Sequence, residues 1–457
     1  MTLPTPGRKL NPFFRWAVLG IMSLICFAQY FIYDSITPLA AMIKAQLGYS
    51  GSEYGLLFSF YSVANVFLLM LILAGVLVDR LGLKISGILY GFLCVLGAVL
   101  TAMGTWDGLS TLAGYEWLHK GFLPSWSPAL KVMLLGRMIY GVGAESILVV
   151  NNKVLARWFR GKELAFAYGL NLTIMRLGTF LALSLQAPAA KMMGLGGALW
   201  FASAVMVAGF ASFFVYLFME KVAVGREGAP MPEKKGLGSD EKFVLREAFS
   251  FNAPFWLITL LCVTFYSAVF PFQSYAPDIL QQKFGYSDVT AGFVASSLIL
   301  GTMICTPILG WFVDRKGKRA TLMFLGSLLL IPCHLLIGYT HFFPLIPIFL
   351  VGVALSLVPA ALWAAIPLMV PESRLGTAFG VIGYVQNVGL MLFPYLAGKI
   401  ADAHTVTGMV GGKEQPIVDH TSTMLMFASL GIIGFAFSWL LKRADRKRGE
   451  VLQQPSH

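Results

Sequence analysis

Twelve apolar stretches of about 20 residues constrain this chain more than any other feature of its sequence. They lie near residues 16–41, 55–79, 84–105, 130–152, 164–188, 196–219, 254–278, 290–313, 320–340, 343–369, 376–401 and 421–441. A helix of that length and polarity can cross the hydrocarbon core of a bilayer. Of the 457 residues 57% are hydrophobic, more than a soluble domain of this length would bury. The sequence therefore predicts an all-α integral membrane protein with 12 transmembrane helices.

The net charge of +12 is explained by the orientation of these helices in the membrane. If the N-terminus is cytoplasmic, most of the 34 lysines and arginines fall in cytoplasmic loops and tails. Such an excess is typical of the cytoplasmic side of membrane proteins. We therefore expect both termini to be cytoplasmic, and we expect no nucleic acid as a partner.

A repeated loop motif divides the chain into two halves of six helices. The pattern G-x-x-x-D-R-x-G-x-[KR] occurs at residues 75–84 and again at residues 310–319, each time between the second and third span of a half. Its glycines permit a tight loop and close helix approach. We predict a gating motif made of Gly75, Asp79, Arg80, Asp314 and Arg315.

The repeat also sets the domain boundaries. We expect an N-terminal six-helix bundle at 1–219, a cytoplasmic linker at 220–252 that is rich in Gly, Pro and charge, and a C-terminal bundle with a basic tail at 253–457. A second repeated pair, Ala167-Tyr-Gly169 and Ala378-Phe-Gly380, indicates extra residues in the first half, at the outer loop 106–129. Its aromatic residues favour anchoring at the membrane interface. A lid or a partner-docking flap is the alternative.

Two charges lie at membrane depth on consecutive spans. Glu145 is in the fourth span and Arg176 is in the fifth. An isolated charge at this depth is costly, so such residues usually face a bundle interior or a water-filled cavity. An acid and a base that face one cavity could hold a ligand carrying both charges. The alternative is that Glu145 is a structural ion-pair partner of Arg137 or of Arg176.

Other polar and aromatic residues in the spans are weaker candidates. Tyr30 and Asp34 are four residues apart and share a helix face, as do the i,i+7 pairs of Glu145 with Asn152 and of Tyr266 with Gln273. Asp34 is either a cavity-lining acid or an acid that reaches water at its helix end. Single aromatic or amide side chains in spans more often pack or join helices than bind ligands. This caution applies to Trp363 and Asn387.

The residue pattern does not favour an enzyme or a receptor. All five cysteines lie inside predicted spans, and the six histidines have no metal-ligand spacing. We see no set of nucleophile and base and no phosphate-binding loop, and the linker is too short for a signalling domain. We expect no cofactor and no metal.

The twelve spans, the paired loop motifs and the Gly136-Arg137-x-x-x-Gly141-x-Gly143 pattern resemble the major facilitator superfamily over nearly the whole chain. A closer resemblance is to its lysosomal dipeptide-transporter subfamily. The stretches that carry it are Phe31–Asp34, Tyr61-Ser62 with Asn65-Val66, Gly143–Ser146, Trp158–Leu164, Ala268–Phe272, Ala361–Trp363, Val370–Glu372, Leu375–Gly380 and Gln386–Leu390.

This resemblance implies a uniporter for dipeptides that works by alternating access, with tolerance for different side chains. The family's key acid and base match Glu145 and Arg176, which would meet the amino group and the carboxylate of the peptide. Tyr61 belongs to the same predicted site. A proton-coupled symporter of amino acids or small carboxylates, with Asp34 and Glu145 carrying the proton, remains the alternative.

The sequence departs from the subfamily in two ways that bear on its location. The insertion 106–129 is not part of the family pattern, and neither tail carries an acidic dileucine sorting signal. We therefore expect a cell (inner) membrane location. We also expect a monomer in the lipid bilayer that needs no accessory subunit.

Overall fold

The computed structural model describes residues 13–454 except 112–113, 122, 160–162, 228–250, 372–373 and 411–412. The first half of the chain forms α1 (Phe13–Asp34), η1 (Thr37–Leu39), α2 (Ala40–Leu47), α3 (Gly51–Phe67), α4 (Met70–Met103), η2 (Asp107–Thr111), α5 (Tyr115–Lys120), α6 (Pro128–Phe159) and α7 (Leu164–Glu227). The second half forms α9 (Ala253–Phe284), α10 (Asp288–Lys316), α11 (Arg319–Tyr339), α12 (Leu345–Ala365), η3 (Ile366–Leu368), α13 (Leu375–Ala403), β1 (Thr405–Val410), β2 (Lys413–Val418), α14 (Thr421–Lys447) and η5 (Val451–Gln453).

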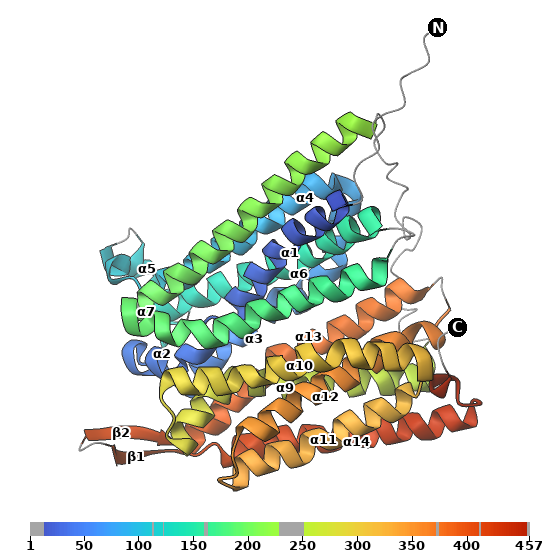
Figure 1. Cartoon of the computed structure of the whole chain (residues 1–457). Coiled ribbons are helices and arrows are strands. Elements are labelled where there is room, and N and C mark those ends of the chain that lie inside the picture. The colour runs from blue at the N-terminus through green and yellow to red at the C-terminus, as the bar shows by residue number, and fades with distance from the viewer. Residues whose placement is uncertain are drawn as a thin grey trace.

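Two glycines turn long helices into hairpins. Gly82 lies within α4 at φ 78° and Gly194 lies within α7 at φ 75°, a backbone region that glycine enters without steric cost. Gly82 belongs to the first loop motif, so the tight loop expected there is present. In Figure 1, α7 runs out and back as two ribbons joined at one end.

The helices account for the predicted membrane crossings. Ten described segments are long and apolar enough to span a membrane, and the longest of them, Phe166–Ala223, contains the turn at Gly194. The predicted second span is divided between α3 and the first part of α4, because the helix breaks at Leu68 and at Leu69, where φ is 51°. This chain path is consistent with 12 transmembrane helices.

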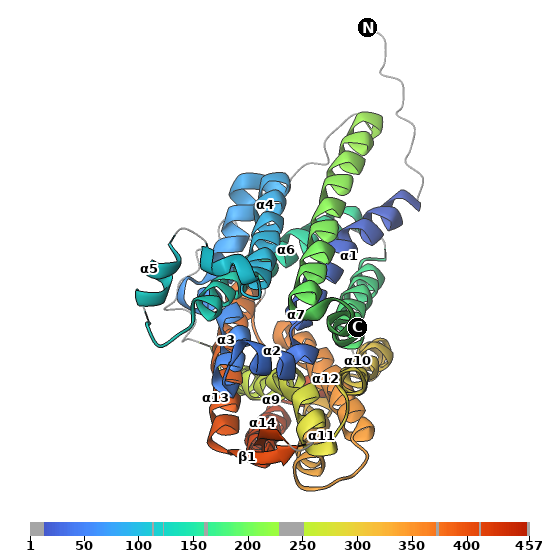
Figure 2. The ribbon, with the colours of Figure 1, turned by 90° about the vertical axis from the view of Figure 1, so that its left-hand side faces the viewer.

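The helices form two bundles that meet at one end of the molecule. Figure 1 shows α1–α7 in one bundle and α9–α14 in the other, with their ribbons diverging toward the end that holds both termini of the described chain. We call this end the terminal side. The opposite end carries α2, α5 and the β1–β2 hairpin, and we call it the hairpin side. Figure 2 views the molecule from the hairpin side.

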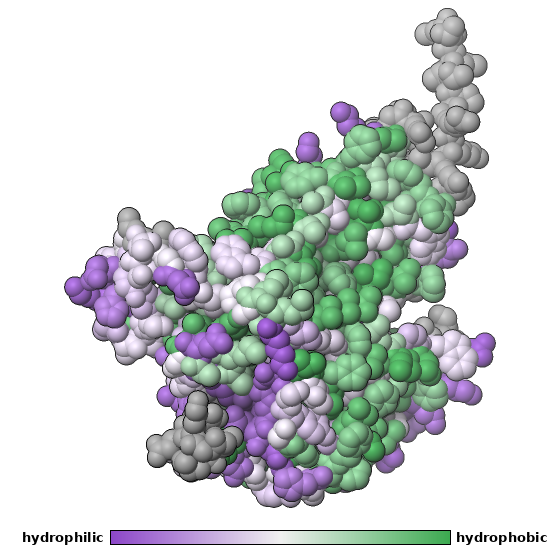
Figure 3. Space-filling view, turned by 60° about the vertical axis from the view of Figure 1, so that its left-hand side comes forward, coloured by the Kyte–Doolittle hydropathy of each residue, from purple (hydrophilic) through white to green (hydrophobic). Residues whose placement is uncertain are grey.

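Large apolar side chains cover much of the outside of both bundles. Exposed examples lie on every long helix, such as Phe92 on α4, Phe218 on α7 and Trp311 on α10. Figure 3 shows this apolar surface across both bundles and polar residues gathered toward the hairpin side. A lipid environment removes the cost of exposing such surface to water, so the chain is an integral, multi-pass membrane protein.

The connecting segments differ in structure. The insertion 106–129 folds into η2 and α5, which, with Leu47, Ser127 and Pro128, border a surface pocket of about 250 Å³. Helix α7 extends into the expected linker as far as Glu227, and residues 228–250 lie outside the described part of the chain. Between α13 and α14, strands β1 and β2 pair antiparallel from Thr405 opposite Val418 to Val410 opposite Lys413. This hairpin was not among the elements predicted from the sequence.

Candidate functional site

The acid at membrane depth, Glu145, is held by a tyrosine from a neighbouring helix. The Tyr61 hydroxyl on α3 donates a hydrogen bond of 2.8 Å to Glu145 Oε1 on α6. The two helices approach closely here because α6 carries Gly141, where a Cβ would lie 2.0 Å from the Tyr61 carbonyl oxygen. A hydrogen bond to an ionised acceptor is stronger than one between neutral groups, and it fixes the direction in which the carboxylate points.

The base at membrane depth, Arg176, packs on an aromatic ring of α1. Its Cζ lies 5.7 Å from the ring centroid of Tyr30, a distance typical of cation–π attraction. Its Nε is buried and has no hydrogen-bond partner. Tyr30 lies close enough to both Arg176 and Glu145 to interact electrostatically with each. Three of the predicted site residues are therefore neighbours in the N-terminal bundle.

Within the described part of the chain, Glu145 forms an ion pair neither with Arg137 nor with Arg176. Arg137 instead donates hydrogen bonds to the backbone carbonyls of Leu57, Ile32 and Tyr33. In this conformation Glu145 is thus not a structural ion-pair partner of either arginine. Both charges remain open to a ligand.

Asp34 and Gln273 join the two bundles. Gln273 Nε2 on α9 donates a hydrogen bond of 2.8 Å to Asp34 Oδ1 at the end of α1, and both side chains are buried. Asp34 therefore lies in the contact between bundles at the hairpin side, one helical turn beyond Tyr30. Arg176 is near enough to act on Asp34 electrostatically.

The C-terminal bundle contributes an aromatic wall. Trp363 Nε1 on α12 donates a hydrogen bond of 3.1 Å to the Tyr266 hydroxyl on α9. The Tyr266 ring stacks on Phe270 at 5.5 Å, and the Trp363 ring stacks on Phe379 of α13 at 6.0 Å. Tyr266 also lies within electrostatic range of Arg176, so this wall faces the charged residues of the other bundle.

Two further predicted residues, Asn387 and Asn152, make hydrogen bonds within their own bundles. Asn387 Nδ2 donates to the Gly383 carbonyl of its own helix, while its Oδ1 is buried without a partner. Asn152 is exposed, and its carbonyl accepts a hydrogen bond from the Tyr168 hydroxyl.

The gating-motif residues lie at the terminal side. Arg80 is exposed, and the Arg315 guanidinium packs over the Trp311 ring. The side chains of Asp79 and Asp314 lie outside the described part of the structure. The close helix approach expected at Gly75 is absent from this conformation, because a Cβ there would meet nothing within 4 Å.

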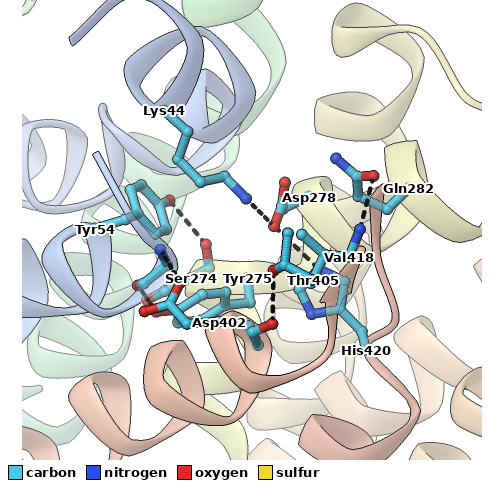
Figure 4. A network of polar contacts seen from close by, with 12 residues as sticks. Lys44, Tyr54, Ser274, Tyr275, Asp278, Gln282, Asp402, Thr405, Val418 and His420 are labelled. Carbon is cyan, nitrogen blue, oxygen red and sulfur yellow. Dashed lines mark hydrogen bonds and ion pairs between the residues drawn. The ribbon is translucent and has the colours of Figure 1, made fainter. Parts of the chain in front are cut away.

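A second polar cluster lies on the hairpin side and was not predicted from the sequence (Figure 4). Lys44 Nζ and His420 Nε2 both contact Asp278 Oδ2, at 2.6 Å and 3.0 Å. Asp402 of α13 accepts hydrogen bonds from the backbone N–H groups of Gly51 and Ser52 at the start of α3. The sequence signal for this cluster is Asp278, an acid within the apolar seventh span.

The loop that precedes α14 is fixed by a local hydrogen bond. Asp419 accepts from the Thr421 backbone N–H at 2.9 Å. Together with the Thr421 hydroxyl, this holds the pKa of the Asp419 carboxyl below its usual value.

Two bundles of membrane-spanning helices with charged side chains between them are an arrangement that many multi-pass membrane transporters use. The profile of the Major Facilitator Superfamily matches residues 22–394 and 269–456, so the chain belongs to this superfamily and is a transporter, not an enzyme. It is 28% identical over 412 residues to the lysosomal dipeptide transporter of Danio rerio, covering 87% of this chain and 84% of that protein. The human lysosomal dipeptide transporter is 29% identical over 395 residues, which cover 85% and 80% of the two chains.

Solved structures show the same fold at low sequence identity. A nucleoside transporter variant matches with a TM-score of 0.70 at 17% identity, covering 93% of this chain and 99% of that chain. A bacterial homologue of the human lysosomal transporter Spinster, in an inward-facing and unoccupied conformation, matches with a TM-score of 0.68 at 18% identity, covering 96% and 99%.

Proposed function

We propose that this transporter moves zwitterionic dipeptides across the membrane. The observation that carries the proposal is the pair of half-buried opposite charges, Glu145 and Arg176, which form no ion pair with each other within the described chain. A free dipeptide offers an ammonium group for the carboxylate and a carboxylate for the guanidinium. The likeness to proteins named lysosomal dipeptide transporters supports the same substrate class.

The carrier works by rocking its two bundles around this central site. In the present conformation the bundles contact each other at the hairpin side, through pairs such as Asp34 with Gln273. The excess of lysine and arginine in the predicted cytoplasmic loops supports a cytoplasmic terminal side, and with that orientation this conformation is closed to the outside. We infer a protein of the cell (inner) membrane with both termini cytoplasmic, active as a monomer without an accessory subunit.

The second candidate function is proton-coupled symport of amino acids or small carboxylates. It is favoured by the presence of two acids that both act electrostatically on Tyr30, the buried Asp34 and the half-buried Glu145. A uniporter needs no acid that carries a proton, because the substrate gradient alone drives net transport.

The two candidates are separated by transport into proteoliposomes that contain the purified chain alone. Uniport predicts rapid exchange of a radiolabelled dipeptide against internal dipeptide, and no accumulation when an inward proton gradient is imposed. Glu145→Gln and Arg176→Gln should each lower the exchange at least tenfold, whereas Glu116→Gln, which alters an exposed acid of α5, should not. Accumulation driven by the proton gradient would support symport. Failure of the purified chain to transport any dipeptide would count against both the substrate and the independence from a subunit.

A further inference from the structure

One ion pair between described residues joins the two bundles, and it lies at the hairpin side. Lys44 Nζ on α2 is 2.6 Å from Asp278 Oδ2 on α9. The Asp278 side chain is 0% exposed and that of Lys44 is 16% exposed. The other described ion pairs stay within one bundle, as Arg157 with Glu220 and Arg446 with Glu450 do. The charge of Lys44 thus balances a fully buried carboxylate of the other bundle.

Asp278 has a second partner in its own bundle. His420, at the start of α14, places Nε2 3.0 Å from the same oxygen, Oδ2, and its side chain is 1% exposed. Figure 4 shows Lys44 and His420 reaching the carboxylate from opposite bundles. When the hairpin side opens, Lys44 departs with α2, while Asp278 and His420 move together.

One imidazole nitrogen of His420 has no partner and is shielded from water in the closed conformation. His420 Nδ1 is buried without a hydrogen-bond partner. A proton on Nδ1 would therefore be a buried donor with no acceptor, which is unfavourable. The neutral imidazole with its proton on Nε2 fits this conformation, because Nε2 can then donate to Asp278 while Lys44 supplies the positive charge.

We propose that His420 replaces Lys44 as the cationic partner of Asp278 when the hairpin side opens, taking up one proton as it does so. Opening admits water to Nδ1 and removes the ammonium group, so a protonated imidazole then neutralises the carboxylate. Acid on the hairpin side consequently favours the open conformation. The inference rests on the alternating-access carrier proposed above and on no particular substrate.

The surrounding groups leave this exchange of partners intact. The titratable and charged side chains around the pair of His420 and Asp278 include Lys44, Tyr54, Tyr275, Lys283, Asp402, His404 and Asp419. Lys283 is committed to the carbonyls of Ile337 and Gly338. Asp419 accepts from Thr421, and His404 Nε2 contacts the Ser422 hydroxyl. Of these groups, Lys44 and Tyr54 belong to the other bundle, and Lys44 is the cation of the two.

The test measures opening directly and needs no substrate. Spin labels are placed at Met192→Cys on α7 and at Phe343→Cys before α12, both exposed at the hairpin side, in a background in which the five native cysteines are replaced. Double electron–electron resonance in nanodiscs then reports the ratio of long to short distances between pH 8 and pH 5. We expect this ratio to rise as the pH falls, by no more than tenfold per pH unit because one proton is bound.

The variants give distinct expected results. His420→Gln should stay closed and lose the pH response. Lys44→Gln should raise the open fraction at every pH, because the closed conformation then holds the buried Asp278 carboxylate without an ammonium group. Lys44→Arg and the control Lys131→Gln, whose native ammonium contacts the Leu118 carbonyl within one bundle, should behave like the parent protein. A full pH response in His420→Gln, or an unchanged closed population in Lys44→Gln, would overturn the proposal, whichever substrate the carrier proves to move.

Discussion

Arg137 shows how a buried charge can be satisfied by backbone alone. Its side chain is almost fully buried, and its three nitrogens donate to the carbonyls of Leu57, Ile32 and Tyr33 at 2.8, 3.3 and 3.2 Å. Helix α1 ends at Asp34, so the carbonyls of its last turn lack the usual helical partners, although that of Ile32 also accepts from the backbone N–H and the hydroxyl of Ser35. A planar guanidinium with five N–H donors suits this task. Arg137 thereby ties α6 to both α1 and α3, the helices that supply Tyr30 and Tyr61.

Replacing Arg137 with lysine should destabilise the protein without removing its charge. A single ammonium group cannot reach carbonyls on two helices in the geometry of a guanidinium. Each buried acceptor left unsatisfied costs about 1–3 kcal/mol, so we expect a clearly lower melting temperature in detergent. Arg80→Lys, at an exposed position, is the matched control. Equal melting temperatures for Arg137→Lys and the parent protein would show that these hydrogen bonds contribute little.

At the level of elements, the contact between α3 and α13 closes the hairpin side. Small residues make it possible: a Cβ on Gly55 would lie 2.3 Å from the Pro394 carbonyl oxygen, and one on Gly398 would lie 2.1 Å from the Gly51 carbonyl oxygen. Close backbone approach of this kind is a common way for helices to pack in membranes. The Tyr275 hydroxyl then reaches the carbonyls of Gly51 and Pro394.

Gly55→Val should therefore prevent full closure of the hairpin side. Overpacking of a tight contact costs about 1–3 kcal/mol, which lowers the ratio of closed to open protein roughly fivefold or more. Distances between spin labels at the hairpin side should lengthen, and dipeptide exchange should slow. Gly20→Val provides the control, because a Cβ at Gly20 on α1 meets nothing within 4 Å. An unaltered distance distribution in Gly55→Val would be incompatible with this role of the α3–α13 contact.

Local sequence predicted the elements better than the contacts between them. Apolar length identified the spans, and the loop motif located the turn at Gly82. Burial cost singled out Glu145 and Arg176. The Asp34–Gln273 and Lys44–Asp278 contacts were not predicted, because they join bundles through a packing that no local pattern encodes. The β1–β2 hairpin has a sequence signal, the alternating Thr-Val-Thr before a Gly-Gly pair. The length of apolar stretches, from which the spans were predicted, does not detect this pattern.

At the scale of the molecule, the proposed function divides substrate recognition between the two bundles. The N-terminal bundle supplies the acid and the base, and the C-terminal bundle faces them with Tyr266 and Trp363. In the proposed function, charges fixed in one bundle would read the ends that all dipeptides share. An uncharged aromatic wall in the other would accommodate side chains that differ. Such a division would account for selectivity toward dipeptides as a class within a superfamily fold that carries many substrates.

The most direct test of this account is the thermal stabilisation of the purified protein by a matched panel of ligands. The panel contains free dipeptides, the same dipeptides N-acetylated or C-amidated, single amino acids and dicarboxylates. A ligand that binds only the folded protein adds about 2.7 kcal/mol at one hundred times its dissociation constant. We predict that free dipeptides alone raise the melting temperature and that Glu145→Gln and Arg176→Gln each abolish the shift. Stabilisation by blocked dipeptides, or by amino acids but not dipeptides, would contradict recognition of both charged ends.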